Sequence, residues 1–144
     1  LLPADTRLAA GWVAAAARVM AGSPDRAAYF RFTLEAGEAG ARRLERVLAW
    51  RSARLGLPTA EQGLLISRIL LDAVGGVRPM PALAEFDLAR RLGGRRLAGL
   101  QVPAVSSAMA WRRDGWWRRG LRELTCLVLY ALGLPSGMIA RLHG

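Results

Sequence analysis

Apolar residues recur along most of this chain at intervals of three and four, which is the spacing of an amphipathic helix. Glycine and proline residues separate the apolar runs at places where helices ordinarily end and begin. Residues 23–25 (Ser-Pro-Asp) offer a cap, a preorganised first turn and an acid, and Thr59 and Gln62 have the spacing of a capping box. The sequence contains no hairpin signal and no internal repeat. The pattern therefore predicts an all-α fold.

The predicted helices differ in how much of their surface is apolar. The run at residues 60–74 is apolar nearly all round, which predicts a central, buried helix. At 144 residues and 53% apolar composition, we expect one compact domain over residues 1–144, a bundle of six to eight helices around residues 60–74. The other predicted helices are about 6–21, a helix from Pro24 through Tyr29, Phe30 and Phe32, then 41–55, 81–92, 103–111 and 116–132, with a last turn after Pro135.

The charge of the chain narrows the choice of partner. Its formal net charge is +10, and its sequence pI is near 11.6. Lysine and asparagine are both absent, which is typical of a GC-rich source, so arginine in place of lysine is not itself a functional signal. The excess of arginine over acidic residues is nevertheless uneven: residues 1–72 hold ten arginines and seven acids, whereas residues 73–144 hold eleven arginines and four acids. A cationic half of this kind favours an anionic partner.

The excess is strongest between Leu88 and Arg122, where nine arginines stand against one acid, Asp114, and three tryptophans are interspersed. Arginine carries a permanent charge and a planar donor fork, and indole adds a flat apolar surface. Five apolar residues of the 116–132 helix are expected to form a stripe that faces the core: Trp117, Leu121, Leu124, Val128 and Ala131. The candidate partner-binding residues of this window are Arg112, Arg113, Trp116, Trp117, Arg118, Arg119 and Arg122. The alternative is that the tryptophans pack internally and the arginines are ordinarily solvated.

Residues suited to catalysis or metal binding are scarce. His143 is the only histidine and Cys126 the only cysteine, so a transition-metal site lacks ligands and an intrachain disulfide is excluded. We expect His143 to be a solvated terminal residue and Cys126 a small core residue. The sequence thus predicts no catalytic residue, no metal and no cofactor.

The longest apolar run and the first residue of the chain indicate whether it could span a membrane and whether it has been processed. The longest uninterrupted apolar run near the C-terminus is about half of the roughly 20 residues that a spanning helix needs, so we expect no transmembrane segment. The chain begins with Leu rather than Met, which suggests a processed product or a part of a longer protein.

Two segments are similar to parts of a known helical family. Residues 111–117 (WRRDGWW) resemble the tryptophan and glycine motif near the C-terminal end of the apoptosis-regulating B-cell-lymphoma fold, and residues 67–70 (SRIL) resemble the start of its central helix. The family's Asn-Trp-Gly before that arginine is missing here, and its short death motif cannot be placed on an earlier helix. The resemblance implies a hydrophobic groove that receives an amphipathic partner helix, with Arg68 pairing with an acid of that helix.

These observations favour a binding module over an enzyme. The leading hypothesis is protein–protein interaction through an apolar groove or patch rimmed by arginines. The alternative is binding of RNA or DNA by the arginine- and tryptophan-rich surface at 90–122, and peripheral contact with an anionic membrane is compatible with the same charge. The groove implied by the B-cell-lymphoma resemblance is a further alternative.

Overall fold

The computed structural model describes residues 1–81 and 83–143, with side chains for residues 1–81 and 83–141. The strands are β1 (Thr6–Leu8), β2 (Ala27–Leu34), β3 (Leu64–Leu65) and β4 (Leu97–Ser106). The α-helices are α1 (Trp12–Gly22), α2 (Ala39–Leu55), α3 (Arg68–Ala73), α4 (Ala84–Leu92), α5 (Met109–Asp114), α6 (Trp116–Ala131) and α7 (Ser136–His143). Two short 3₁₀ helices are η1 (Ala60–Gln62) and η2 (Gly94–Arg96).

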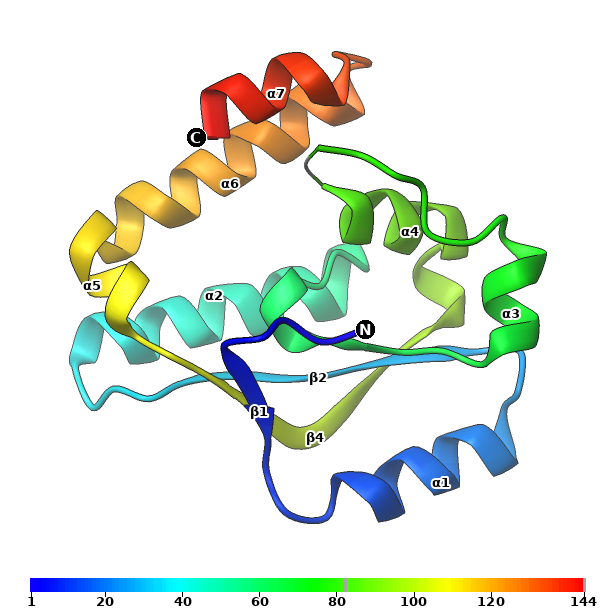
Figure 1. The fold of residues 1–144 in the computed structure, drawn as a ribbon. Coiled ribbons are helices and arrows are strands. Elements are labelled where there is room, and N and C mark those ends of the chain that lie inside the picture. The colour runs from blue at the N-terminus through cyan, green and yellow to red at the C-terminus, as the bar shows by residue number, and fades with distance from the viewer. Residues whose placement is uncertain (82, 144) are drawn as a thin grey trace.

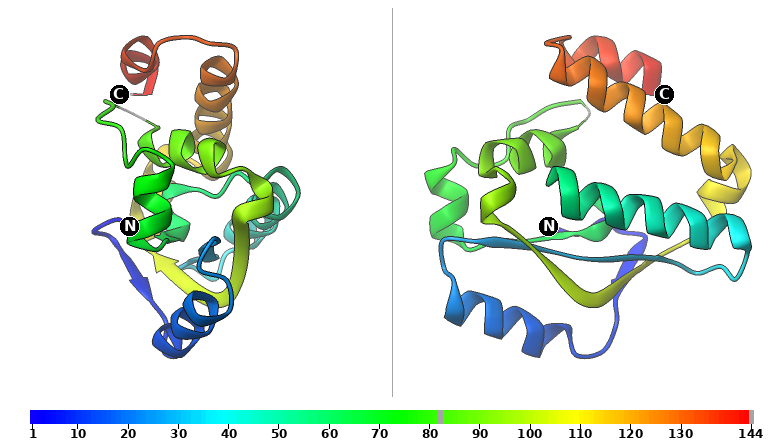
Figure 2. Two further views of the ribbon diagram at one scale, coloured as in Figure 1. Left: turned by 90° about the vertical axis from the view of Figure 1, so that its right-hand side faces the viewer. Right: turned by 180° about the vertical axis from the view of Figure 1, so that it is seen from behind.

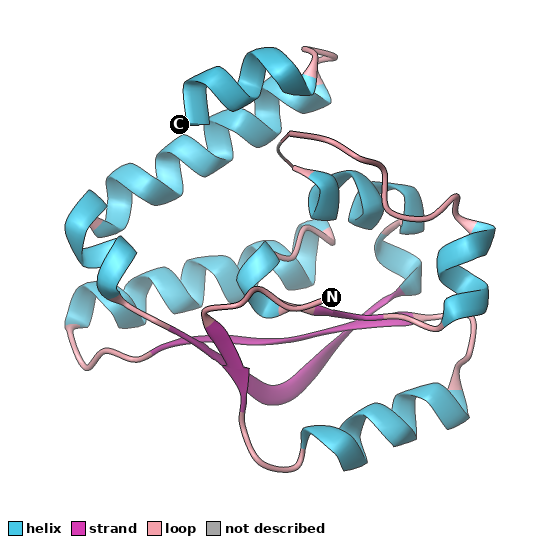
Figure 3. Cartoon of the chain, viewed as in Figure 1, coloured by secondary structure: helices cyan, strands magenta, loops and turns pink. Residues whose placement is uncertain are grey.

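A four-stranded sheet forms the centre of the molecule (Figure 3). The strand order is β1-β4-β2-β3, with β2 and β4 parallel and the two outer strands antiparallel to their neighbours. Helix α1 lies on one side of the sheet, and α2, α4, α5 and the α6–α7 hairpin lie on the other (Figures 1 and 2). The prediction of an all-α bundle is therefore wrong, and the protein is an α/β fold. That residues 1–144 form one domain stays a prediction.

Three of the predicted helices are confirmed. Helices α2, α4 and α6 match the predicted ranges 41–55, 81–92 and 116–132 to within a few residues. Helix α2 ends as expected at Gly56, whose φ of +64° favours glycine. Local periodicity was sufficient at these places because each helix has one distinct packed face.

The segment predicted as a helix from Pro24 is instead strand β2. All of its residues except Arg31 and Thr33 are buried. A strand paired on both sides and covered on both faces loses the alternation of polar and apolar residues, so its continuous apolar run looks like a buried helix. The helix predicted over residues 6–21 is also partly wrong, since β1 occupies its first residues and α1 begins only at Trp12.

The predicted central helix at residues 60–74 does not exist as one element. Its residues form η1, β3 and α3 in succession, because Gly63 adopts a φ of +64° and the Ser67 side chain caps α3 by accepting a hydrogen bond from the Leu70 amide. Helix α3 lies at one end of the sheet, where Leu70 is buried but Ile69 is 84% exposed. The parallel pair of β2 and β4 takes the central place instead.

The range predicted as a helix at 103–111 holds the end of β4 and the start of α5. Strand β4 changes register against β2 between the pairs Tyr29–Gly99 and Arg31–Pro103, where the chain bends (Figure 1). A Cβ at Gly99 would lie 3.1 Å from the Tyr29 hydroxyl, so glycine permits this close approach. The sequence did not predict this strand, because proline within a strand and nearby glycines are atypical of strands.

The core consists of two apolar clusters that meet along β2. The first joins β2 to α4 and the ends of β3 and β4, and the second joins β2 to α2 and α5. Trp111, at 1% exposed, is the largest fully buried side chain of the second cluster. Trp111 of α5 belongs to this second cluster and Trp116 of α6 packs against it, and these two helices bear every predicted binding residue except Arg68.

Candidate functional site

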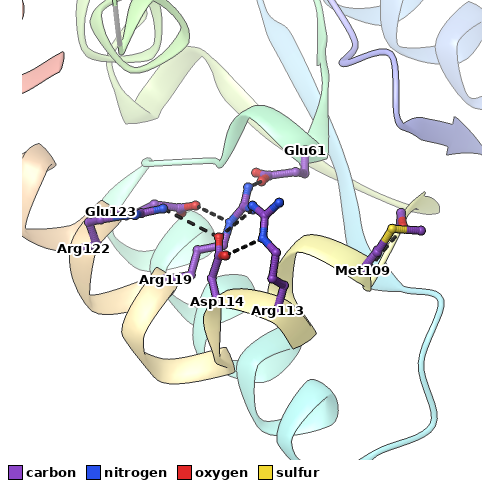
Figure 4. A network of polar contacts seen from close by, with 8 residues as sticks. Glu61, Met109, Arg113, Asp114, Arg119, Arg122 and Glu123 are labelled. Carbon is purple, nitrogen blue, oxygen red and sulfur yellow. Dashed lines mark hydrogen bonds and ion pairs between the residues drawn. The ribbon is translucent and has the colours of Figure 1, made fainter. Parts of the chain in front are cut away.

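Three arginines converge on one acid where α5 meets α6 (Figure 4). Arg113 Nε donates to Asp114 Oδ1 at 2.8 Å, and Arg119 and Arg122 each place a terminal nitrogen within 4 Å of Asp114 Oδ2, at 3.9 and 3.8 Å. The hydrogen bond from Arg113, reinforced by all three positive charges, lowers the pKa of the Asp114 carboxyl. Arg118 lies beside them and forms no ion pair with an acid of the described residues. We call the open depression formed here the arginine hollow, lined by Arg113, Asp114, Arg118, Arg119, Leu121 and Arg122.

Arg119 is held inside the molecule rather than presented to a partner. Its guanidinium carbon lies 4.7 Å from the centroid of the Trp111 ring, and its nitrogens approach Glu61 at 3.3 Å and Glu123 at 3.4 Å. Figure 4 shows the side chain between these acids and Asp114. With only 23% of the side chain exposed, Arg119 joins α6 to α5 and η1, which gives it a structural task that its sequence neighbourhood did not reveal.

The three tryptophans of the predicted window have different environments. Trp111 is buried and packs against Phe32, with ring centroids 6.0 Å apart. Trp116 is half-buried beside Gly40, where an added Cβ would come 2.9 Å from the indole. Only Trp117 is exposed, at 50%. Of the three indoles, Trp117 alone is available to a partner.

Helix α6 faces the opposite way from the sequence prediction. Its inward side carries Arg119, Glu123, Cys126 and Leu127, of which the last two are buried. The apolar stripe predicted to face the core is exposed throughout: Trp117 50%, Leu121 63%, Leu124 47%, Val128 49%, with Ala131 exposed as well. Leu132, one turn beyond Val128, continues the row at 74% exposed. The prediction of a core stripe is therefore wrong, and α6 turns its apolar side to the surface.

Helix α2 extends this exposed apolar surface. Val47 and Trp50, at 47% and 60% exposed, line a shallow depression together with Trp117 and two arginines, Arg43 and Arg46. The four residues that α2 contributes recur at intervals of three and four, so they share one face of that helix. We call the whole surface the apolar strip, which consists of Val47, Trp50, Trp117, Leu121, Leu124, Val128 and Leu132.

The remaining predicted residues lie around or away from this strip. Arg112 is exposed and donates from Nε to Glu38 Oε1 at 2.8 Å, which ties α5 to the start of α2. Arg68 begins α3 at the far end of the sheet from α5, and its side chain, 85% exposed, pairs with Asp72. The structure thus brings together every predicted binding residue except Arg68. The resemblance to the B-cell-lymphoma fold does not extend to the architecture, because α3 has only six residues and a sheet occupies the centre.

A cavity of about 320 Å³ lies below the inward side of α6. It is lined by residues of α6, of the C-terminal part of α2, of η1 and of the start of α4, and it is open to solvent. Its polar lining consists of Arg51, Thr59, Glu61, Glu85, Arg119 and Glu123, and its apolar lining includes Phe86 and Leu127. No residue of this cavity except Arg119 was among the predicted site residues, because its members come from four separate elements.

Buried Gln62 positions the η1 wall of the cavity. Its Oε1 accepts from Ser52 Oγ at 2.6 Å and from the Thr59 amide at 2.9 Å, and its Nε2 donates to the Phe30 carbonyl at 3.0 Å. The bond to the Thr59 amide is the glutamine half of the predicted capping box. These three bonds fix η1 against α2 and β2, and thereby point Glu61 toward Arg119.

Charge inside the cavity is only partly compensated. Burial lowers the pKa of the Arg51 guanidinium, and the carboxylates of Glu123 and Glu61 act against that effect. Burial also raises the pKa of Glu123 to about 7; the nearby Glu61 raises it further, and Arg119 and Arg51 oppose the rise. A carboxyl group with a pKa near neutrality can hold or release a proton at physiological pH, which is the property required of a general acid or base.

Among residues 1–81 and 83–143, no helix combines the length and the apolar character needed to cross a bilayer. Among the described side chains, those of residues 1–81 and 83–141, no three of the His, Cys, Asp and Glu types gather in a way that could hold a metal ion. Cys126 is buried in α6, as expected, and the side chain of His143 lies outside the described part of the chain.

Sequence signals existed for the strip but not for the cavity. The spacing of the apolar residues of α6 correctly showed that they share a face, and the excess of arginine beside them was evident.

Comparisons with known proteins add no relative: no protein-family model matches the chain, no curated protein matches its sequence, and no solved structure matches its fold.

Proposed function

We propose that the protein is a binding module that docks on a partner through the apolar strip and the arginines beside it. The exposed apolar face of α6 carries this proposal. Large contiguous apolar patches rimmed by polar residues ordinarily mark interaction sites, because leaving them in water is unfavourable. Here five large apolar residues in one row of α6 and its C-terminal cap are between 47% and 74% exposed, while Arg119 and Glu123 of the same helix point inward.

The same surface favours an apolar partner over a nucleic acid. Trp111, Trp116 and Arg119, which the nucleic-acid hypothesis would use for stacking and phosphate contacts, have internal packing partners. Leucine and valine side chains along α6 offer nothing to a phosphate backbone. Binding to a protein stays a prediction, and RNA or DNA binding is the less favoured alternative.

A photo-crosslinking amino acid placed at Leu121 tests this function. Val13 on α1 is the matched control site, because the two residues are exposed to the same extent, at 63% and 61%. In cells of the source organism, we expect a strong adduct from position 121 and little from position 13. The chemical class of the adduct, whether protein, lipid or nucleic acid, identifies the partner class. Equal yields at both positions would contradict a docking role for the strip.

A second candidate function is suggested by the cavity under α6. Thr59 is 7% exposed, its hydroxyl donates to no acceptor among the described residues, and it lies in the cavity wall. A buried donor without an acceptor is unfavourable, so a ligand that accepts from this hydroxyl would gain affinity. Beside it stand buried Arg51, partly buried Arg119 and the Glu123 carboxyl with its raised pKa. We infer that this cavity can hold a small polar ligand and exchange a proton with it.

The pH dependence of stability tests the proton-holding property of Glu123. Its folded-state pKa of about 7 lies above the ordinary value of 4.5. The folded protein therefore binds this proton more tightly, and the stabilisation is present below pH 4.5 and is lost as the pH rises through 7. Between pH 5 and pH 8 we expect the free energy of unfolding to fall by up to about 3 kcal/mol from this group. In the Glu123→Gln variant, the free energy of unfolding measured with urea should no longer show this fall between pH 5 and pH 8.

The matched control for Glu123 is Glu85→Gln at the exposed rim of the same cavity, which should keep the wild-type pH profile. If wild type and Glu123→Gln have parallel profiles from pH 5 to pH 8, the carboxyl does not titrate near neutrality and the second function loses its chemical basis.

A further inference from the structure

We infer that the partner of the apolar strip is an anionic lipid bilayer, and that the α6–α7 hairpin lies in the membrane surface with the apolar side of α6 turned to the acyl chains. This inference rests on the proposed docking function and names its partner. It involves no spanning segment, because a helix lying in the interface needs only one apolar face.

The apolar component is a row rather than isolated residues. Helix α6 has 16 residues, which corresponds to about 24 Å at 1.5 Å per residue, and its apolar row continues to Leu132. Trp117 lies at the beginning of this row and Trp50 beside it, and tryptophan is the side chain that prefers the boundary between headgroups and acyl chains. Helix α7 packs on α6 and begins at Ser136, four residues after Leu132, and its Met138 is 57% exposed.

The charged component lies on both sides of this row. On one side, Leu121 belongs both to the apolar strip and to the arginine hollow, so the row directly adjoins Arg118 and Arg122. On the other side, Arg43 and Arg46 line the depression that holds Trp117. None of Arg43, Arg46 and Arg118 forms an ion pair with an acid of the described residues.

Arginine beside an exposed apolar row matches the chemistry of an anionic phospholipid, which carries a phosphate directly above its apolar chain. A planar guanidinium binds phosphate oxygens in a bidentate manner. In the arginine hollow Arg113, Arg118 and Arg122 stand around one acid, Asp114, which leaves net positive charge for a phosphate even though Arg119 is also paired with Glu61 and Glu123. The charge complementarity of the surface therefore favours a bilayer of anionic lipids over an uncharged one, and over a protein groove that would have to supply both acids and a long apolar trough.

Vesicle co-sedimentation tests the inference with the whole chain. Vesicles of equal parts phosphatidylglycerol and phosphatidylcholine should bind the protein, and vesicles of phosphatidylcholine alone should bind it far more weakly. Leu121→Gln with Leu124→Gln removes two exposed apolar contacts and should weaken binding at least about tenfold. Arg118→Gln with Arg122→Gln should weaken binding to the anionic vesicles about 25-fold, since each arginine near an anionic surface contributes about fivefold.

The matched control replaces equally exposed apolar residues far from the strip, Val13→Gln with Ile69→Gln, at 61% and 84% exposed, and should bind like wild type. Circular dichroism of each variant confirms that the fold is retained, as expected for surface changes. Absence of binding to anionic vesicles would overturn the membrane inference. A protein adduct at position 121 in the crosslinking experiment would in that case leave the docking function standing with a different partner. Vesicle binding that the strip variants leave unchanged would also overturn the membrane inference, and the docking function would then be decided by the crosslinking yields at positions 121 and 13.

Discussion

Replacement of Trp111 by alanine should lower the free energy of unfolding by about 3–5 kcal/mol, the range for truncating a buried aromatic residue. The indole is 1% exposed, contacts Phe32, and has the Arg119 guanidinium above its ring. The substitution leaves a cavity in the second core cluster and also removes the aromatic face that supports a partly buried cation. Urea denaturation monitored by circular dichroism measures the loss.

Trp50→Ala is the control for this prediction, because Trp50 is 60% exposed and belongs to the apolar strip. Its free energy of unfolding should change by no more than about 0.5 kcal/mol. If Trp111→Ala cost less than about 1 kcal/mol, the indole would not be the packed centre of this cluster, and the position of α6 over α5 would be in doubt.

Replacement of Asp87 by alanine should also lower the free energy of unfolding by about 3–5 kcal/mol, the usual cost of removing one partner of a buried ion pair. The carboxylate is 4% exposed; it accepts from Arg91 Nε at 2.8 Å and from the Tyr130 hydroxyl at 2.9 Å, and Arg78 lies 3.5 Å away. Arg91 in turn donates to the carbonyls of Val74 and Gly76. Asp87 thus connects α4 to α6 and to the loop after α3.

The pH dependence of the Asp87 variant follows from the carboxyl group. Burial alone would raise its pKa, but the hydrogen bonds from Tyr130 and Arg91 and the charges of Arg91 and Arg78 lower it below 3.8. A lowered pKa means that the stabilisation is present above pH 3.8 and is lost as the pH falls through the folded-state value. The difference between wild type and Asp87→Ala should therefore be constant near neutrality and shrink in acid. The control is Asp72→Ala, whose carboxylate forms an exposed pair with Arg68 and should contribute little.

The sequence predicted those features that depend on neighbours close in the chain. Helices α2, α4 and α6 were predictable because an amphipathic period and a glycine stop act within a few residues. The glutamine half of the capping box at residues 59–62 formed for the same reason. The arginine excess beside α6 was also a property of composition alone, and its residues do cluster in space.

The strands could not be predicted in this way because their pairing joins distant segments. Strand β2 pairs with residues 97–106 and with residues 64–65, and no local pattern encodes either partner. Because β2 is covered on both faces, its sequence lacks the alternation of polar and apolar residues that identifies a strand. The apolar run at 60–74 predicts one long helix, but Gly63 and Ser67 divide it into three shorter elements.

The functional surfaces show the same division between local and tertiary information. By itself the sequence determined that Trp117, Leu121, Leu124 and Val128 share one face of a helix and that arginines flank them. Only the tertiary structure decided that this face points outward, because Arg119 finds Trp111, Glu61 and Glu123 on the inward side and Cys126 and Leu127 are buried there. A periodic pattern defines which residues lie together, but the direction in which they face depends on the surfaces that other elements bring against the helix.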